Sequence, residues 1–160
     1  MSTNTLAQAQ ALAIQLQQRR WMLATAESCT GGLIAGACTD LSGSSNWFER
    51  GFVTYSNAAK TELLGVPSQL IAQHGAVSEP VARAMAQGAL RHAAAQVAVA
   101  VTGVAGPSGG TADKPVGLVW FGFAMPDCVT SEKMHFPGDR AAVRAAAVRH
   151  ALSRLVELLS

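Results

Sequence analysis

The sequence predicts an α/β fold in which residues 1–160 form a single three-layer αβα domain around a mostly parallel, mixed sheet. Helix-like and strand-like segments alternate along most of the chain, an order typical of a parallel sheet covered on both faces. The segment Val97–Val101 is apolar at every position, which indicates a central strand with both faces buried. Two consecutive strand-like segments near the C-terminal end predict an antiparallel hairpin.

The first elements follow from apolar spacing. From Leu6 to about Arg20, apolar residues recur at the spacing of one helix face, which predicts an amphipathic helix. The short apolar run Trp21–Ala26 predicts a strand, and Leu33–Leu41 predicts a helix. The Ser- and Gly-rich segment after this helix, to residue 46, is expected to be a loop. Phe48–Tyr55 is the second expected strand.

The middle of the chain is predicted to be helical. Asn57–Leu64 indicates a short helix with a glycine directly after it as its stop signal. Pro67 and Ser68 indicate a turn, with Ser68 in the role of a helix N-cap. A long Ala-rich helix is expected over about Ser78–Ala95, with its first residue as the N-cap.

The last third of the chain supplies the remaining strands. The buried strand Val97–Val101 ends in a loop with four glycines, Thr102–Gly110. Val116–Ala124 predicts a fourth strand, and the more polar Val129–Phe136 predicts an edge strand. The final helix is expected over Asp139–Leu159, because apolar side chains recur there every three or four residues.

Composition excludes several classes of protein. Hydrophobic residues make up 49% of the chain and charged residues 14%, the opposite of the balance found in disordered proteins. The net charge of +2 is too small for the basic surface of a nucleic-acid-binding protein. No apolar run approaches the roughly 20 residues of a membrane span, and the N-terminus has no signal-peptide pattern. We therefore expect neither a nucleic acid nor a membrane as a partner.

The cysteines and histidines indicate free thiols and no metal site. Cys29, Cys38 and Cys128 lack CxxC spacing, as is typical of reduced cysteines in a cytoplasmic protein. The four histidines are scattered, without an HExxH motif or a Cys/His cluster. We expect a cytoplasmic protein with no metal ion and no cofactor.

Polar segments follow three of the expected strands and carry most of the reactive side chains. They are Glu27–Gly32, Tyr55–Lys60 and Thr102–Gly110. Ligands of open α/β sheets bind beyond the carboxyl ends of the strands. If the three strands are parallel, the three segments meet at one edge of the sheet and form a site.

Ser28 is the candidate nucleophile. It occupies an expected strand-to-helix turn followed by Gly31 and Gly32. Unpaired backbone N–H groups and the partial positive charge of a helix terminus can stabilise an oxyanion there, although the GxSxG pattern of a nucleophile elbow is absent. In the alternative interpretation, Ser28 or Thr30 only caps the helix, and the glycines only allow close packing.

A serine nucleophile needs a base, and Lys60 is the candidate. None of the three polar segments contains a histidine, whereas burial can lower the pKa of a lysine towards neutrality. One helical turn brings Lys60 back toward the strand end, where Tyr55 can orient it or relay a proton. In the alternative interpretation, Lys60 is an ordinary solvated helix residue. Lys133 lies on the expected edge strand, where lysine opposes edge-to-edge pairing.

Substrate contacts are expected from the glycine-rich loop and the last helix. Thr102 and Gly103 open a loop that fits neither GxGxxG nor GxxxxGK[ST], so a nucleotide-phosphate loop is not indicated. Its glycines still allow a ligand to approach the backbone closely. Arg140 and Arg144 are one turn apart and can hold a phosphate together. The alternatives are a plain loop and a solvated basic helix face.

Two neighbours of Ser28 have open roles. Cys29 is a rival nucleophile because a helix N-terminus lowers the pKa of a thiol, but no histidine accompanies it. Glu27 can act as an acid or base, or it can bond a loop amide, and the sequence does not decide between these roles.

The chain resembles the CinA C-terminal domain family through an ordered set of six motifs, over about residues 6–159. Each motif alone is weakly specific, but the six in this order are highly specific. They are Ala26–Gly32 (AESCTGG), Tyr55–Lys60 (YSNAAK), Val77–Ser78 (VS), Thr102–Gly110 (TGVAGPSGG), Lys114–Gly117 (KPVG) and Phe136–Arg140 (FPGDR).

The resemblance implies an amidohydrolase that converts nicotinamide mononucleotide and water to nicotinate mononucleotide and ammonia, in pyridine nucleotide salvage. It implies Ser28 as nucleophile, Lys60 as base and Tyr55 as a supporting residue. It also implies a stand-alone form of the domain and a homo-oligomer. Residues of the matched motifs and of the last helix are then expected to contact the small-molecule substrate: Thr30, Gly31, Gly32, Thr102, Gly103, Arg140 and Arg144.

Two other functions stay open on the sequence. The association of the family with competence and DNA damage is compatible with a non-catalytic module that binds a nucleotide or a protein partner. The third reading is an amidase for a different small amide, because nothing in the sequence measures the size of the pocket. Release of ammonia distinguishes an enzyme from a non-catalytic binding module. A panel of substrates distinguishes the deamidation of nicotinamide mononucleotide from that of another small amide.

Overall fold

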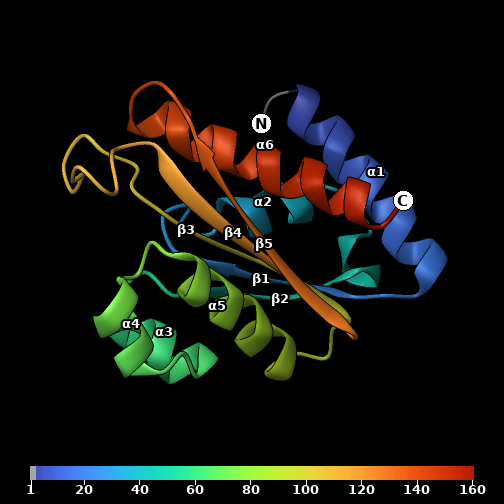
Figure 1. Ribbon diagram of the computed structural model, residues 1–160. Coiled ribbons are helices and arrows are strands. Elements are labelled where there is room, and N and C mark those ends of the chain that lie inside the picture. Colours follow the sequence, from blue (N-terminus) through green and yellow to red (C-terminus); the bar gives the residue numbers. More distant parts are fainter. Residues whose placement is uncertain (1–2) are drawn as a thin grey trace.

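The computed structural model describes residues 3–160 and contains a five-stranded sheet between two layers of helices (Figure 1). The strand order is β2-β1-β3-β4-β5, in which neighbouring strands are hydrogen-bonded. The strands are β1 (Leu23–Glu27), β2 (Phe48–Val53), β3 (Val97–Gly103), β4 (Leu118–Met125) and β5 (Cys128–His135). Strands β2, β1 and β3 are mutually parallel, whereas β4 and β5 form an antiparallel extension. The predicted α/β fold, with its mixed sheet and C-terminal hairpin, is confirmed.

Helices cover both faces of this sheet. One layer holds α1 (Thr3–Arg19), α2 (Leu33–Thr39) and α6 (Arg140–Leu158), and the other holds α3 (Asn57–Leu64), α4 (Ser68–His74) and α5 (Glu79–Arg91) (Figure 1). A short 3-10 helix, η1 (Ser44–Asn46), precedes β2. Among residues 3–160, no helix is both long and apolar enough to cross a membrane.

The two faces of the sheet carry side chains of different size. Large apolar side chains face α1 and α6: Leu23, Val97, Val99, Val101, Val119, Phe121 and Phe123. Alanines face α5: Ala24, Ala26, Ala98, Ala100 and Ala124. Because successive strand residues point to opposite faces, the same strands build both surfaces. The alanine face brings α5 so near that a side chain at Gly122 of β4 would collide with the carbonyl of Ala82.

The same close packing positions α3, which carries Lys60. A Cβ atom at Gly88 of α5 would collide with the carbonyl oxygen of Leu64 at the end of α3, so the two helices touch backbone to backbone. The Ser56 side chain accepts a hydrogen bond from the N–H of Ala59 and starts the helix. Docked in this way, α3 leaves Lys60 only 1% exposed.

The structure differs from the predicted boundaries after α3. The expected turn is the helix α4, and Pro67 rather than Ser68 is its N-cap. This prediction was wrong because Ile71 is the one buried residue among the seven of this helix, so no apolar spacing marks it in the sequence. Helix α5 ends at Arg91, earlier than expected. There the chain must extend, because the backbone of Gln96 donates to Met22 and its side chain accepts from Met22.

Candidate active site

Three parallel strand ends meet at one edge of the sheet. Glu27, the last residue of β1, is paired with Val53 of β2 and with Val101 of β3. The N–H of Ser28 donates to the Val101 carbonyl at 3.0 Å, and the N–H of Thr54 donates to the Glu27 carbonyl at 2.9 Å. The segments that follow the three strands therefore start side by side, as the parallel arrangement predicted.

Ser28 and Lys60 are in direct contact at this edge. The Lys60 Nζ atom lies 3.1 Å from Ser28 Oγ and 3.1 Å from the Tyr55 carbonyl oxygen. The Ser28 hydroxyl lies 3.4 Å from the same carbonyl. Ser28 is 8% exposed and Lys60 is 1% exposed, so the two groups are shielded from bulk water. The interpretation of Lys60 as a solvated surface residue is wrong.

Burial sets the protonation of Lys60. It lowers the pKa of the amine below its ordinary value, and the neighbouring Cys29 opposes this effect more weakly. Within residues 3–160, the hydrogen bonds of the amine go to a hydroxyl and a carbonyl, and no carboxylate pairs with it. A buried amine without a counter-charge favours its neutral form, which is the form that can accept a proton.

Tyr55 contacts Lys60 through its backbone and not through its phenol. The phenol hydroxyl accepts a hydrogen bond of 3.1 Å from Arg140 Nη2, and the residue is 60% exposed. Arg140 Nη1 also donates to the carbonyl of Gly106 at 2.9 Å. The side chain therefore links the segment before α3 to the start of α6, whereas its carbonyl orients the lysine amine. A proton relay through the phenol is not supported by this geometry.

The Glu27 carboxylate forms hydrogen bonds within the turn after β1 and with the start of α2. Its carboxylate accepts hydrogen bonds from the Thr30 hydroxyl at 2.6 Å, from the Ile34 N–H at 2.9 Å and from the Ala35 N–H at 3.0 Å. The residue is 1% exposed. These bonds satisfy amide groups at the start of α2, which would otherwise lack partners. Of the roles left open by the sequence, bonding to loop and helix amides is the one found.

The turn after β1 leaves backbone donors beside Ser28. Gly31 and Gly32 adopt φ angles of 57° and 105°, a region that side-chain-bearing residues avoid. Within residues 3–160, the N–H groups of Cys29 and Thr30 have no main-chain acceptor. Donors of this kind stabilise the oxyanion of an acyl-transfer reaction when they point at it.

Cys29 is a poor rival to Ser28. Burial raises the pKa of its thiol to about 11, so the thiol is protonated at neutral pH. The expected lowering of this pKa by the start of a helix was therefore wrong. Because the thiolate is the nucleophilic form of cysteine, the serine is the better-placed nucleophile in this turn.

A cavity of about 370 Å³ opens onto the Ser28–Lys60 contact. Six of the ten predicted site residues line it: Ser28, Tyr55, Lys60, Thr102, Gly103 and Arg140. The other four, Thr30, Gly31, Gly32 and Arg144, do not. The lining also includes Asn57 and Val77, which lie within matched motifs but were given no role, and Ala76. The motifs could have indicated Asn57 and Val77, whereas an apolar residue such as Ala76 carries no sequence signal.

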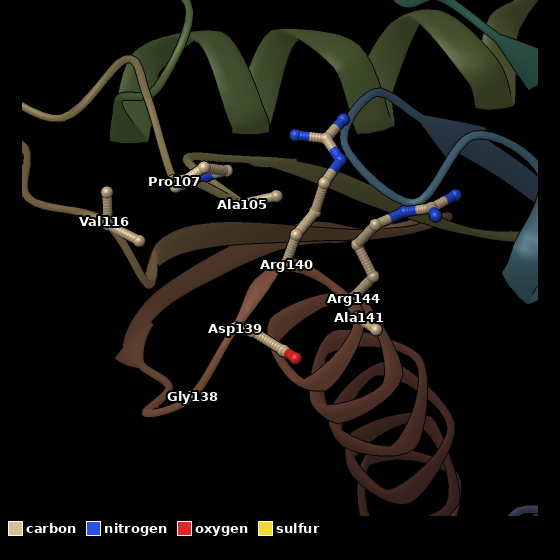
Figure 2. Close-up of a pocket in the computed structure, with 8 residues that line it drawn as sticks. All are labelled: Ala105, Pro107, Val116, Gly138, Asp139, Arg140, Ala141 and Arg144. Carbon is tan, nitrogen blue, oxygen red and sulfur yellow. The ribbon is translucent and has the colours of Figure 1, made fainter.

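A second cavity of about 660 Å³ (Figure 2) shares lining residues with the first. Ala105 and Arg140 line both cavities, and Arg144 lines only the second. Figure 2 shows the two arginine side chains extending from the first turns of α6 on the same side, while Asp139 points away from them. The Asp139 carboxylate accepts a hydrogen bond from the N–H of Ala142 and caps α6. Among residues 3–160, no group of three or more His, Cys, Asp or Glu side chains could hold a metal ion.

Comparison with known proteins decides the family. The family model described as "CinA C-terminal domain" matches residues 5–159. The chain belongs to this family. The resemblance inferred from the six motifs is confirmed over almost the whole chain.

Relatives within the family agree with the expected class of enzyme. The chain is 61% identical to nicotinamide-nucleotide amidohydrolase PncC of Enterobacter agglomerans, over 82% of this chain and 81% of that protein. It is 54% identical to the protein of the same name from Escherichia coli K12, over 88% and 86%. The crystal structure of competence/damage inducible protein CihA from Agrobacterium tumefaciens superposes with a TM-score of 0.97 at 44% identity, covering 100% of this chain and 98% of that one.

Proposed function

We propose that this chain is an amidohydrolase that deamidates nicotinamide mononucleotide to nicotinate mononucleotide and ammonia, as a step of pyridine nucleotide salvage. The observation that carries the proposal is the 3.1 Å contact between the buried Lys60 amine and the Ser28 hydroxyl, at the mouth of a cavity between strand ends. The amide and the nucleotide are those named in the two PncC relatives, each a nicotinamide-nucleotide amidohydrolase.

The first half of the reaction forms an ester on Ser28. The Lys60 amine, whose pKa burial lowers, accepts the Ser28 proton in its neutral form while Oγ attacks the carboxamide carbon. The N–H groups of Cys29 and Thr30 stabilise the oxyanion. The tetrahedral intermediate collapses as its C–N bond breaks, and Lys60 returns the proton to the leaving nitrogen, which departs as ammonia.

The second half of the reaction releases the acid. Water attacks the nicotinoyl ester, and Lys60 accepts a proton from that water. The C–O bond to Ser28 then breaks, Lys60 protonates the serine oxygen, and the carboxylate product leaves. The Tyr55 carbonyl, 3.1 Å from the lysine nitrogen, holds the amine in place through both halves.

The two cavities divide the substrate between them. The carboxamide and its ring enter the first cavity, of about 370 Å³, which Ser28, Thr102 and Gly103 line. The phosphoribosyl group occupies the second cavity, of about 660 Å³. Arg140 lines both cavities and lies beside this group. Each guanidinium has five N–H donors in a planar fork that suits phosphate, so Arg140 can keep its contact to Gly106 and still bind the anion.

The test is ammonia release from nicotinamide mononucleotide, nicotinamide and glutamine. The mononucleotide is expected to be the preferred substrate. Ser28→Ala is expected to lose nearly all turnover, whereas Ser131→Ala, a matched change on the edge strand β5, keeps it. Full ammonia release by a folded Ser28→Ala variant contradicts the mechanism. Binding of the nucleotide without any turnover favours a non-catalytic binding module, and preference for another amide contradicts the substrate.

Three coarser expectations accompany this function. Residues 1–160 act as one catalytic domain, free of any cofactor. The chain works in the cytoplasm, consistent with the free thiols of Cys29, Cys38 and Cys128. It assembles as a homo-oligomer, which light scattering coupled to gel filtration checks directly.

A further inference from the structure

Arg144 lies in α6 but makes its hydrogen bonds with the turn after β1. Its Nε donates to the Cys29 carbonyl at 3.0 Å, and its Nη2 donates to the Thr30 carbonyl at 3.4 Å. A Cβ atom at Gly31 would lie 3.4 Å from Nη2, so the guanidinium rests against the turn. These carbonyls belong to the two residues that directly follow Ser28.

Glu27 bonds to the same turn at Thr30 and to the helix that follows it. Its carboxylate accepts from the Thr30 hydroxyl and from the N–H groups of Ile34 and Ala35. The carboxylate therefore ties the Thr30 hydroxyl to the start of α2, and the guanidinium of Arg144 holds the Cys29 and Thr30 carbonyls. Thr30 is bonded by both, through its hydroxyl and its carbonyl.

We infer that Glu27 and Arg144 are positioning residues that clamp the Ser28 turn at Thr30, through its hydroxyl and its carbonyl, and that Arg144 serves the nucleophile rather than the substrate phosphate. This inference rests on the proposed role of Ser28 as nucleophile. Hydrogen bonds to charged groups are stronger than neutral ones, and the planar fork of arginine suits two carbonyls at once. The clamp fixes the backbone of Cys29 and Thr30, whose N–H groups are the proposed oxyanion donors.

The role of the clamp is tested with a reagent that lacks phosphate and pyridine. Phenylmethanesulfonyl fluoride bonds its sulfur to Ser28 Oγ and releases fluoride, while Lys60 takes the serine proton. The rate of this modification is followed by mass spectrometry, with the site mapped to Ser28. Arg144→Lys keeps the charge but loses the fork, and it is expected to slow labelling by roughly 10- to 100-fold, because small misplacements of reacting groups are costly. Arg149→Lys is the matched control in the same helix, since Arg149 forms no side-chain hydrogen bond within residues 3–160.

Steady-state kinetics with nicotinamide mononucleotide separate the two roles of Arg144. A positioning residue lowers kcat and leaves KM nearly unchanged. Arg144→Lys that labels at the wild-type rate and raises KM for the mononucleotide is a phosphate contact, which overturns the inference. Equal slowing by Arg149→Lys, or a wild-type chain that is not labelled at Ser28, overturns it as well. Labelling of wild type at Ser28 without ammonia release refutes the proposed substrate and leaves the clamp intact.

Substitution of Glu27 tests the clamp independently of Arg144. Glu27→Gln places an NH2 group where the carboxylate accepted a hydrogen bond, and it is expected to slow labelling in the same way. Combined with Arg144→Lys, it should slow labelling by less than the product of the two single effects, because both act on one turn. Where circular dichroism shows that Glu27→Gln does not fold, Thr30→Val removes one bond of the clamp and takes its place. Labelling of a folded Glu27→Gln or Thr30→Val variant at the wild-type rate overturns the clamp.

Discussion

The parallel half of the sheet buries ionisable side chains at its strand ends, whereas the antiparallel half keeps its ionisable groups nearer the surface. Around β2, β1 and β3, Glu27 and Lys60 are each 1% exposed, and within residues 3–160 neither forms an ion pair. Along β5, Glu132 forms ion pairs with His150 and Arg154, and these side chains are 21–34% exposed. The two buried groups bond to backbone and hydroxyl groups, whereas the ionisable groups nearer the surface, Glu49 and Arg50 of β2 included, bond to each other.

This difference shows which part of the sheet contains an arrangement that lowers the stability of the fold. An unpaired buried amine opposes folding, because the charged form loses its hydration and the neutral form must give up a proton. Partly exposed ion pairs contribute little in either direction. The half of the sheet with the unfavourable arrangement is the half whose strand ends carry the site, as expected where reactivity depends on a shifted pKa.

The largest contrast is expected from two equivalent lysine substitutions. Lys60→Met should lower kcat for ammonia release by about 100- to 10,000-fold, because general-base catalysis contributes on this scale. Lys133→Met removes a lysine of the antiparallel half that lies 5.8 Å from the centre of the Trp120 ring, and kcat should be unchanged. Steady-state assays at saturating substrate make the comparison. Similar activity in both variants would remove the functional distinction between the two halves.

The pH dependence of activity sharpens the assignment to Lys60. Only the neutral amine accepts a proton, so kcat/KM should rise with pH by about tenfold per unit below the pKa of Lys60. Burial lowers this pKa from its ordinary value of 10.5, so the plateau should begin below that pH. The Lys133→Met variant should follow the same curve. A wild-type profile that is flat or falls over this range argues against a lysine base.

Thermal stability should change in the opposite direction from activity. Lys60→Met replaces a buried amine with an apolar chain of similar length, and its Tm should rise by a few degrees, since about 1 kcal/mol moves the Tm of a chain of this size by about 2–4 °C. Calorimetry at several pH values measures the effect.

The same measurement has a defined dependence on pH. Between the lowered pKa of Lys60 and 10.5, the unfolded wild-type chain binds a proton that the folded chain does not. Wild-type stability therefore rises with pH over this window and is lost as pH falls through it. The advantage of the Met variant should shrink as pH increases. An advantage that grows with pH would mean that Lys60 is charged in the folded chain.

The smallest effect is expected on the antiparallel half. Glu132→Gln weakens the pairs with His150 and Arg154, and it should change the free energy of unfolding by less than about 1 kcal/mol. Ammonia release should keep its wild-type rate. Urea unfolding followed by circular dichroism is sensitive enough to measure the change. A loss of several kcal/mol would show that this ion cluster supports the fold as strongly as the apolar core.

Much of the fold could be predicted because its elements are long or strongly patterned. The buried run of β3 and the apolar spacing of α6 show in the sequence, and both were placed within a few residues. Helix α4 was missed because only Ile71 among its seven residues is buried, so no periodic pattern develops. The end of α5 depends on Gln96 bonding to Met22, which is distant in sequence.

The sequence predicted which residues form the site better than it predicted the role of each residue. Ser28, Lys60 and Tyr55 lie together as expected, but the carbonyl of Tyr55 and not its phenol meets the lysine. Arg140 and Arg144 do project from α6 on one side, yet Arg144 bonds to the turn after β1. A helical repeat shows which side chains share a face, but it does not show which loop from elsewhere in the chain will meet that face.

The sequence by itself determined the order of the elements, the apolar face of each and the side chains available for chemistry at three strand ends. Only the tertiary structure decided that Lys60 is buried against Ser28 and that the Cys29 thiol, with its pKa raised to about 11, stays protonated. The physical reason is that burial and pKa depend on what packs around a group. For Lys60 this environment is built by β1, the segment after β2 and the close docking of α3 on α5, which the local pattern around residue 60 does not contain.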